Sequence, residues 1–478
     1  MLRRTLPLAL LATTLACSSS EDPPADTGNT GTPDSGVVPD SGEVPDSGEV
    51  PDSGVVDNDS GVETDTGTGP TCPEAFAPSG VNPTCAPIGT ELQAGTGPIR
   101  RGDMAFAVDQ ACGRVFMFHG DRAEPANCGP AASQFIDDGY LFEPSTGRWY
   151  TLAPNGTKPR NRVRGAGAWD AMRNRFIMFG GRWRSGAAGA YIYQRDVWAF
   201  DPATNSWTEL WAQGTNGGPT GRMNTVMVAD PVGDRVLLFG GGQVSADAQS
   251  FIVDNQTWAF DLSTNTWSQL ATTGTRPTAR LFHVGAFDRN NRVFYIFGGG
   301  GADAFTSPTF FQDLWALDVV AGTWSRVDGG ATLPAGRIKG EMDYDAARNR
   351  LLLFGGHDDQ QLGNDNDLWT FDLSTRTWTN NILGDTFNAP AIGFCDFPAD
   401  FAIVDQCSPE RRESHLFRIF GDQAFMYGGR TDCGLTNDTW ILDLNTHQWR
   451  QVNGSFNGMT CYRSGRTDCD QPDARKCG

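Results

Sequence analysis

Residues 236–241 read VLLFGG, an apolar run that ends in two glycines. The pattern recurs five more times, as VFMFHG at 115–120, FIMFGG at 176–181, FYIFGG at 294–299, LLLFGG at 351–356 and AFMYGG at 424–429. Short apolar runs bounded by turn residues are typical of buried β-strands. Recurrence at a nearly constant spacing indicates a repeat architecture, in which one structural unit is used several times.

One repeat contains four such runs. In the third repeat they are RMNTVMVAD (222–230), RVLLFGG (235–241), NQTWAFD (255–261) and TWSQL (266–270), and none has helical spacing. An aspartate followed five residues later by an arginine, as in Asp230 and Arg235, marks the first turn. The repeat therefore predicts a four-stranded antiparallel sheet, with strands a to d in chain order.

The tryptophans predict how the six sheets pack. One four-stranded sheet buries little apolar surface, whereas six sheets packed face to face around an axis share a continuous core. A tryptophan buries on the order of 150–250 Å², so we expect these rings to act as wedges between neighbouring sheets. Eleven of the 14 tryptophans occupy two places in the repeat, Trp149, Trp207, Trp267, Trp324, Trp378 and Trp449 on strand d and Trp198, Trp258, Trp315, Trp369 and Trp440 on strand c, where the first repeat has Tyr140.

The double glycine followed by DVWAFDPATNSW (196–207) is similar to the kelch repeat. The resemblance covers residues 101–452, with an insertion near 382–411, and it implies an all-β, six-bladed kelch-type β-propeller with four antiparallel strands in each blade. Residues 72–100 form a cysteine-containing lead-in. Within it, GTELQAGTGPIRR (89–101) resembles a strand d with its following loop, and we expect this stretch to help close the ring.

The first 17 residues, MLRRTLPLALLATTLAC, have a basic start, an apolar run and small residues before Cys17. TLAC resembles the lipobox of bacterial lipoproteins, which predicts that residues 1–16 are removed and that Cys17 is acylated. The alternative is a secretory signal cut near Ala16. Either way we expect an exported protein, held at most by its lipid at the outer membrane or cell surface of a bacterium.

Residues 17–71 are predicted to be a disordered acidic tether. The stretch 18–70 has thirteen Asp or Glu and no Lys or Arg, and it repeats the motif PDSGxV. Proline, glycine and like charges prevent such a chain from burying enough apolar surface to fold. The alternative is weak calcium binding by its aspartates. Of the net charge of −20, thirteen negative charges lie here, and no basic stripe is left for nucleic acid.

Cysteines other than Cys17 number ten, an even count that predicts up to five disulfides in an exported chain. Closeness in sequence suggests five pairs, although sequence alone does not fix the connectivity. None of the spacings is typical of zinc sites. The suggested pairs are Cys72 with Cys85, Cys112 with Cys128, Cys395 with Cys407, Cys469 with Cys477, and Cys433 with Cys461; the last three of these residues, Cys461, Cys469 and Cys477, belong to a cysteine-rich tail at 453–478.

The end of the propeller that carries the b–c and d–a loops is the expected binding face, because its loops are long and differ between repeats. Strand a opens with an arginine in each repeat, and six guanidiniums around the channel mouth would repel one another. One interpretation pairs them with aspartates of strand c, and the other leaves some of them to bind an anionic ligand. Gln256 replaces the aspartate in the third repeat, so Arg222 is expected to be unpaired. The arginines are Arg101, Arg164, Arg222, Arg280, Arg337 and Arg412, and the aspartates are Asp138, Asp196, Asp313, Asp367 and Asp438.

Two further groups are candidates for this face. Trp183 and Trp211 fit no place in the repeat and are assigned to the loops flanking the second blade, near Tyr191, where they would either stack on sugars or pack over the channel. His283 and His415 each follow a strand-a arginine by three residues and are either buried, hydrogen-bonded imidazoles or ligands facing the channel.

We therefore expect a monomeric, surface-tethered kelch propeller that binds a protein or glycan, without metal, cofactor or catalytic residues. The alternative is a carbohydrate-active enzyme at the channel mouth, similar to sialate epimerases or to the copper oxidases of the galactose-oxidase type. The oxidases need a cysteine–tyrosine pair, and residues 129–394 contain no cysteine.

Overall fold

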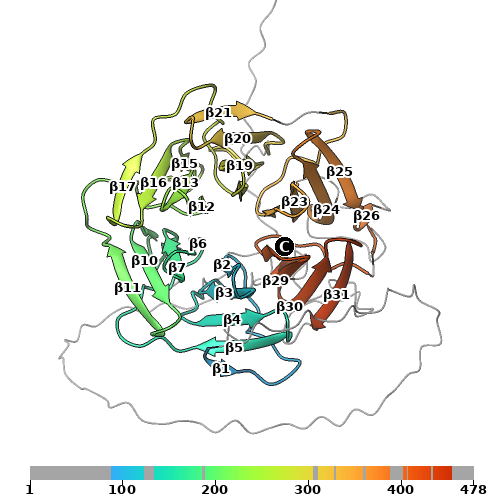
Figure 1. Cartoon of the computed structure of the whole chain (residues 1–478), viewed down its shortest axis with the longest axis horizontal. Coiled ribbons are helices and arrows are strands. Elements are labelled where there is room, and N and C mark those ends of the chain that lie inside the picture. Colours follow the sequence, from blue (N-terminus) through green and yellow to red (C-terminus); the bar gives the residue numbers. More distant parts are fainter. Residues whose placement is uncertain are drawn as a thin grey trace, which may run out of the picture. The chain divides into compact units, whose positions relative to one another are not determined.

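The computed structural model describes residues 88–122, 134–185, 189–304, 310–327, 330–358, 362–387, 402–405, 407–431 and 434–454. The predicted signal peptide, Cys17, the acidic tether, most of the lead-in and the cysteine-rich tail lie outside the described residues. The described part is all β, and none of it forms a helix long and apolar enough to cross a membrane. Six four-stranded antiparallel sheets stand around a central axis (Figure 1), so the predicted six-bladed propeller is confirmed.

Each blade is built from the four consecutive runs of one repeat, with strand a nearest the axis. Blade 1 consists of β2 (Ala105–Asp109), β3 (Arg114–Phe118), β4 (Gly139–Glu143) and β5 (Arg148–Leu152). Blade 2 consists of β6 (Ala166–Asp170), β7 (Arg175–Phe179), β10 (Val197–Asp201) and β11 (Ser206–Trp211). Blade 3 consists of β12 (Val226–Asp230), β13 (Arg235–Phe239), β16 (Thr257–Asp261) and β17 (Thr266–Gln269).

Blades 4 to 6 follow the same order. Blade 4 consists of β18 (Val284–Asp288), β19 (Val293–Phe297), β20 (Leu314–Asp318) and β21 (Thr323–Arg326). Blade 5 consists of β22 (Glu341–Asp345), β23 (Arg350–His357), β24 (Asn364–Asp372) and β25 (Thr377–Ile382). Blade 6 consists of β28 (Leu416–Phe420), β29 (Gln423–Thr431), β30 (Gly434–Asp443) and β31 (Gln448–Asn453).

Three small hairpins extend from the loops. The b–c loops of blades 2 and 3 contain β8 (Arg182–Trp183) with β9 (Ile192–Tyr193) and β14 (Gly242–Val244) with β15 (Phe251–Val253). Between blades 5 and 6, β26 (Thr386–Phe387) pairs with β27 (Ala402–Ile403), inside the region that was expected to be an insertion.

The predicted tryptophan wedges are present at all six junctions. The strand-d tryptophan of each blade packs on the aromatic ring that precedes the two glycines in the blade before it. Trp324 of blade 4, for example, lies 5.1 Å from Phe239 of blade 3, centroid to centroid. The other pairs are Trp207 with Phe118 (4.7 Å), Trp267 with Phe179 (5.1 Å), Trp378 with Phe297 (5.4 Å), Trp449 with Phe354 (4.9 Å) and Trp149 with Tyr427 (4.8 Å).

The ring closes between two complete blades, because blades 1 and 6 each take all four strands from their own repeat. Phe142 of blade 1 stacks on Phe425 of blade 6 at 4.3 Å, and the Tyr427 hydroxyl donates to the Ile99 carbonyl at 2.9 Å. The stretch 89–101, which resembles a strand d and was expected to help close the ring, contains β1 (Thr90–Glu91). This short strand pairs with β5 as a fifth, outermost strand of blade 1, and the residues after it reach blade 6.

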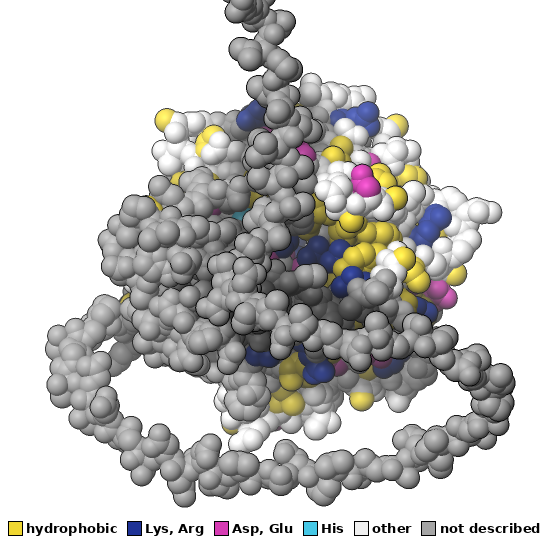
Figure 2. All heavy atoms as spheres, turned by 180° about the vertical axis from the view of Figure 1, so that it is seen from behind, with side chains coloured by type: hydrophobic (Ala, Val, Ile, Leu, Met, Phe, Trp, Pro, Cys, Tyr) yellow, Lys and Arg dark blue, Asp and Glu magenta, His cyan; other side chains and the backbone are white. Residues whose placement is uncertain are grey.

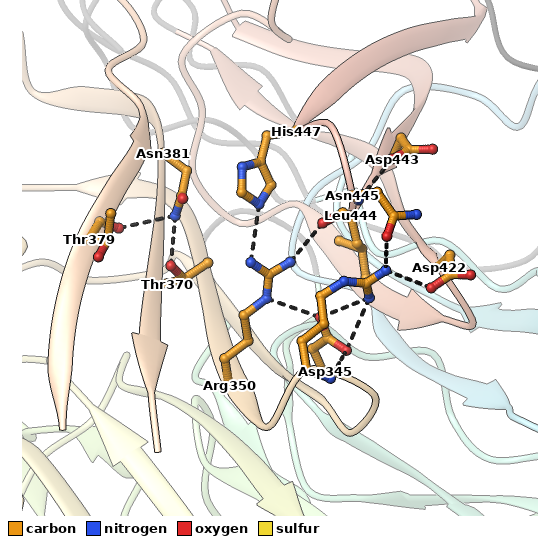
Figure 3. Close-up of polar contacts among 11 residues, drawn as sticks. Asp345, Arg350, Thr370, Thr379, Asn381, Asp422, Asp443, Leu444, Asn445 and His447 are labelled. Carbon is orange, nitrogen blue, oxygen red and sulfur yellow. Dashed lines mark hydrogen bonds and ion pairs between the residues drawn. The ribbon is translucent and has the colours of Figure 1, made fainter. Parts of the chain in front are cut away.

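At the end of the propeller that carries the a–b and c–d turns, the aspartate–arginine motif of the a–b turn connects strands and neighbouring blades. In blade 5, Arg350 Nε donates to Asp345 at 3.0 Å, and its other nitrogens reach the Leu444 carbonyl at 2.8 Å and His447 Nε2 at 3.2 Å in blade 6 (Figure 3). Burial and the adjacent guanidinium lower the pKa of His447, so its neutral ring can accept this hydrogen bond. The turn motif therefore also joins neighbouring blades.

If the wedges carry the packing between blades, Trp324→Ala should lower the free energy of unfolding by about 3–5 kcal/mol, because a fully buried indole is lost and a cavity remains. Denaturant unfolding followed by tryptophan fluorescence measures this. Val320→Ala is the matched control, since Val320 lies on the c–d turn of the same blade and is 70% exposed. Equal effects of the two substitutions would contradict the wedge role.

Candidate functional site

Each blade contains one buried arginine clasp, which in five blades uses the arginine predicted from the sequence. Arg280 is representative: its guanidinium donates to both carboxylate oxygens of Asp313, at 2.6 and 2.9 Å, and to the Gly298 carbonyl at 2.9 Å. Trp315 Nε1 donates to the same carboxylate at 2.6 Å. The clasp therefore links the start of strand a, the double glycine and strand c of one blade.

The same clasp occurs in the other five blades. Blade 2 uses a different arginine from the one predicted, and blade 3 uses a different aspartate. In blade 2 the clasp arginine is Arg162, which binds Asp196 at 2.6 Å, and the predicted Arg164 lies two residues further on. In blade 3 the expectation that Arg222 is unpaired is wrong, because Asp254 replaces the missing strand-c aspartate and lies 2.8 Å from the guanidinium. The remaining pairs are Arg101 with Asp138, Arg337 with Asp367 and Arg412 with Asp438.

The clasps also join neighbouring blades through the backbone. The Gly241 N–H of blade 3 donates to the Arg280 carbonyl of blade 4 at 2.9 Å. A Cβ on Gly240 would lie only 2.8 Å from that carbonyl oxygen, and Gly240 has a φ of 62°, so this place requires glycine. The six clasp arginines are 0–3% exposed, which favours the interpretation of the arginine ring as structural.

A second ring lines the channel mouth, two residues after each clasp arginine. Its members differ in chemistry but share a left-handed backbone, with φ between 52° and 61°. Five backbone hydrogen bonds link them around the ring, including Arg164 N–H to the Asp103 carbonyl and Asp103 N–H to the Ser414 carbonyl. The members of this mouth ring are Asp103, Arg164, Asn224, Phe282, Lys339 and Ser414.

The side chains of the mouth ring enclose a small cavity of about 120 Å³. Arg164 Nε donates to Asp103 at 2.8 Å, and Lys339 Nζ lies 2.8 Å from Glu413. Both cations also approach the Phe282 ring, at 5.7 and 5.6 Å from its centroid. The mouth is therefore a mixed surface of charged groups around one aromatic ring.

His283 and His415 line the same cavity but are packed between blades. The His283 ring meets Phe239 edge-on at 5.5 Å, and the His415 ring meets Phe354 at 5.4 Å. Burial, and then the neighbouring clasp arginines, lower the pKa of each imidazole to about 3. The rings are buried as expected, but neither nitrogen of His415 has a hydrogen-bond partner among the described residues.

Beside the mouth, the β8–β9 hairpin and the loop before β6 contribute a group of basic and aromatic side chains that we call the blade 2 patch: Arg160 from the loop, and Arg182, Trp183, Arg184 and Tyr191 from the hairpin region. Arg182 and Arg184 stack on Tyr191, at 4.1 and 4.7 Å from its centroid, and Arg160 covers Trp183 at 4.3 Å. Figure 2, which views the molecule from behind, shows Lys and Arg side chains beside hydrophobic ones near the middle of the described surface.

Arg182 is the electrostatically unusual member of the patch. Burial and the neighbouring Arg164 lower the pKa of its guanidinium to about 10, and it makes no ion pair within the described part of the chain. Its Nε is buried and has no hydrogen-bond partner among the residues that the structure describes. A cation in these surroundings is stabilised by an anion that approaches it.

Trp211 is not part of this patch. The sequence assigned it to the d–a loop, but it is the last residue of β11 and pairs with Val197 at a bulge. Its ring packs, partly buried, against the core between blades 2 and 3. Trp183, in contrast, lies in the b–c region as expected.

Sequence reasoning did not identify the mouth ring or Arg160. A signal was available, because the residue two places after each clasp arginine is different in every repeat while its flanks are similar. Metal binding gains no support, since no three His, Cys, Asp or Glu side chains converge suitably within the described ranges.

Comparison with known proteins agrees with this geometry. A family model described as the KLHDC2/KLHL20/DRC7 Kelch-repeats domain matches residues 105–341 and 300–467. The chain belongs to the kelch-repeat family. The resemblance in the double glycines and the flanking tryptophans thus reflects membership, and the clasp arginines are part of a kelch propeller.

Similar curated proteins include other kelch proteins. The chain is 25% identical over 240 residues to Kelch domain-containing protein 2 of Bos taurus, covering 49% of this chain and 57% of that protein. It is 29% identical over 223 residues to Kelch domain-containing protein 3 of Homo sapiens, covering 45% and 53%. It is 28% identical over 212 residues to Acyl-CoA-binding domain-containing protein 4 of Arabidopsis thaliana, covering 44% and 28%. The chain spans about half the length of the kelch domain-containing relatives.

Arg222→Ala should lower the free energy of unfolding by about 3 kcal/mol or more, because the Asp254 carboxylate and the Gly240 carbonyl lose their buried partner. Thermal and denaturant unfolding measure the change. Arg276→Ala, on an exposed loop of the same blade, is the control and should change stability by less than about 0.5 kcal/mol. A stable Arg222→Ala variant would show that this clasp is dispensable.

Proposed function

We propose that this kelch propeller is a protein-binding module that holds an acidic segment of its partner between the blade 2 patch and the channel mouth. The observation that carries the proposal is Arg182, a partly buried guanidinium that stacks on Tyr191 and has no ion pair among the described residues. A carboxylate of the partner would supply the missing charge and gain a charge-assisted hydrogen bond.

The scaffold supports a binding role on this face. The residues that repeat in each blade form the clasps and wedges. The residues of the mouth ring differ from blade to blade, and the basic and aromatic patch occurs on blade 2. Binding residues on a rigid scaffold concentrate in such variable loops. The β8–β9 and β14–β15 hairpins are also joined to each other, because the Val244 N–H donates to the Tyr193 hydroxyl at 2.8 Å.

A protein ligand is favoured over a glycan by the surroundings of Trp183. Stacking on a sugar uses an open indole face, and Arg160 already covers one of the two faces of this partly buried ring. The enzyme alternative gains no support, because the two histidines at the mouth are buried and neutral. The tethering of the module at a bacterial surface through Cys17 is part of the proposal and is supported by the sequence of residues 1–17.

The disulfide pairing also stays a prediction. Only Cys112 and Cys407 lie within the described residues, and their suggested partners, Cys128 and Cys395, lie outside them.

Binding of a fluorescently labelled hexaglutamate peptide, measured by fluorescence anisotropy at low salt, tests the proposal. Arg182→Ala should weaken binding about 10-fold, which corresponds to the loss of one charge-assisted contact. Arg376→Ala, an exposed arginine on a c–d turn at the opposite end, should leave the affinity unchanged. Equal loss in both variants would mean that the peptide responds to net charge alone, and it would overturn the proposed site.

A further inference from the structure

The channel wall is apolar in four blades and charged in two. The third residue of each innermost strand occupies the same register, and on β22 and β28 it is Asp343 and Arg418. One strand position earlier on that face, blade 5 also carries Glu341. The equivalents of Asp343 in the first four blades are small and apolar: Ala107, Ala168, Val228 and Ala286.

This wall encloses a cavity of about 510 Å³ at the turn end of the channel, away from the blade 2 patch. Trp169, Phe287 and Met227 are among its larger apolar lining residues, and Asp343 and Arg418 line the charged side. The volume lies within the range of roughly 300–1,000 Å³ that is usual for small-molecule sites. Arg418 lines both this cavity and the mouth cavity, as do Gly167, Met227 and Gly285.

On the charged side, Asp343 and Arg418 have different partners. Arg418 donates to Glu341 at 2.8 Å and lies over the Phe106 ring at 4.4 Å, which directs it toward Glu341. Asp343 accepts only backbone hydrogen bonds, from Ile419 and Tyr344 at 2.8 Å each, and makes no ion pair within the described ranges. Arg289 also lines the cavity, and like Arg418 it opposes the rise in the pKa of Asp343, but its side chain is exposed to solvent and forms no ion pair with Asp343 within the described ranges.

Burial is the main influence on the titration of the two carboxyl groups of blade 5. Burial raises the pKa of Asp343, and burial raises the pKa of Glu341 to about 7 even though Arg418 opposes the shift. Two carboxyl groups that share one guanidinium are stabilised in their ionised form by an additional cation.

We propose that this cavity binds a small organic monocation, with a primary ammonium group at Asp343 and an apolar body against Trp169, Phe287 and the small residues of blades 1 to 4. The ammonium donates to the free lone pairs of the Asp343 carboxylate, and the apolar body is removed from water. This site is separate from the proposed protein-binding face and does not depend on it.

Isothermal titration of the full chain with hexylammonium chloride, and with hexan-1-ol as the neutral isostere, tests the proposal. Hexylammonium should bind about 10-fold more tightly than hexanol, which is the effect expected of one charged hydrogen bond. Asp343→Asn should abolish that preference and leave hexanol binding unchanged. Arg182→Ala should change neither affinity, which distinguishes this site from the blade 2 patch.

A second variant keeps the test decisive if Asp343→Asn does not fold. Val228→Phe fills the cavity from the opposite wall without changing any charge, and it should weaken both ligands about 10-fold. The proposal is overturned if wild-type protein binds the amine and the alcohol equally, or if Val228→Phe leaves both affinities unchanged.

Discussion

The structure depends on one repeated interaction, the pairing of a buried arginine guanidinium with a carboxylate near the start of strand a in each blade. A charge removed from water is tolerated only where it is paired and fully hydrogen-bonded. In this propeller the partners are a strand-c carboxylate, the carbonyl of the first glycine and the tryptophan that binds the same carboxylate. The arginine carbonyl then accepts a hydrogen bond from the second glycine of the preceding blade. One residue thus fixes the interior of its own blade and its distance from the next.

The same constraint explains why function is expected only at certain places. Residues that form the clasps and wedges cannot vary without loss of stability. Ligand-binding residues are therefore expected at the positions next to them. The mouth ring begins two residues after the clasps, where the chain turns through a left-handed conformation and the side chain is free to differ. Blade 2 uses this freedom for Arg164 and its basic hairpin, and blade 5 carries Glu341 and Asp343 at two positions that are apolar in the first four blades.

The sequence was sufficient for the fold because its signals agree at several levels. Periodic glycines, tryptophans at two places of the repeat and the turn aspartates each indicate the same four-stranded unit. It was also sufficient for the idea of an arginine–aspartate clasp. It was not sufficient for the register of blade 2, where RNRVR offers three arginines and only packing selects Arg162. Nor did it reveal Asp254, because a carboxylate two residues from the usual place compensates through loop geometry that sequence spacing does not encode.

Hydrogen exchange of the native protein tests the clasp account most directly. The Gly241, Gly299 and Gly356 amides donate to arginine carbonyls of the following blades, at 2.8–2.9 Å. If these junctions hold the ring together, the three amides should exchange only through global unfolding, as slowly as the amides of the central strands β13, β19 and β23. Exchange as fast as that of the exposed hairpin residues Ile192 and Ile252 would show that the blades separate locally, and it would contradict the account.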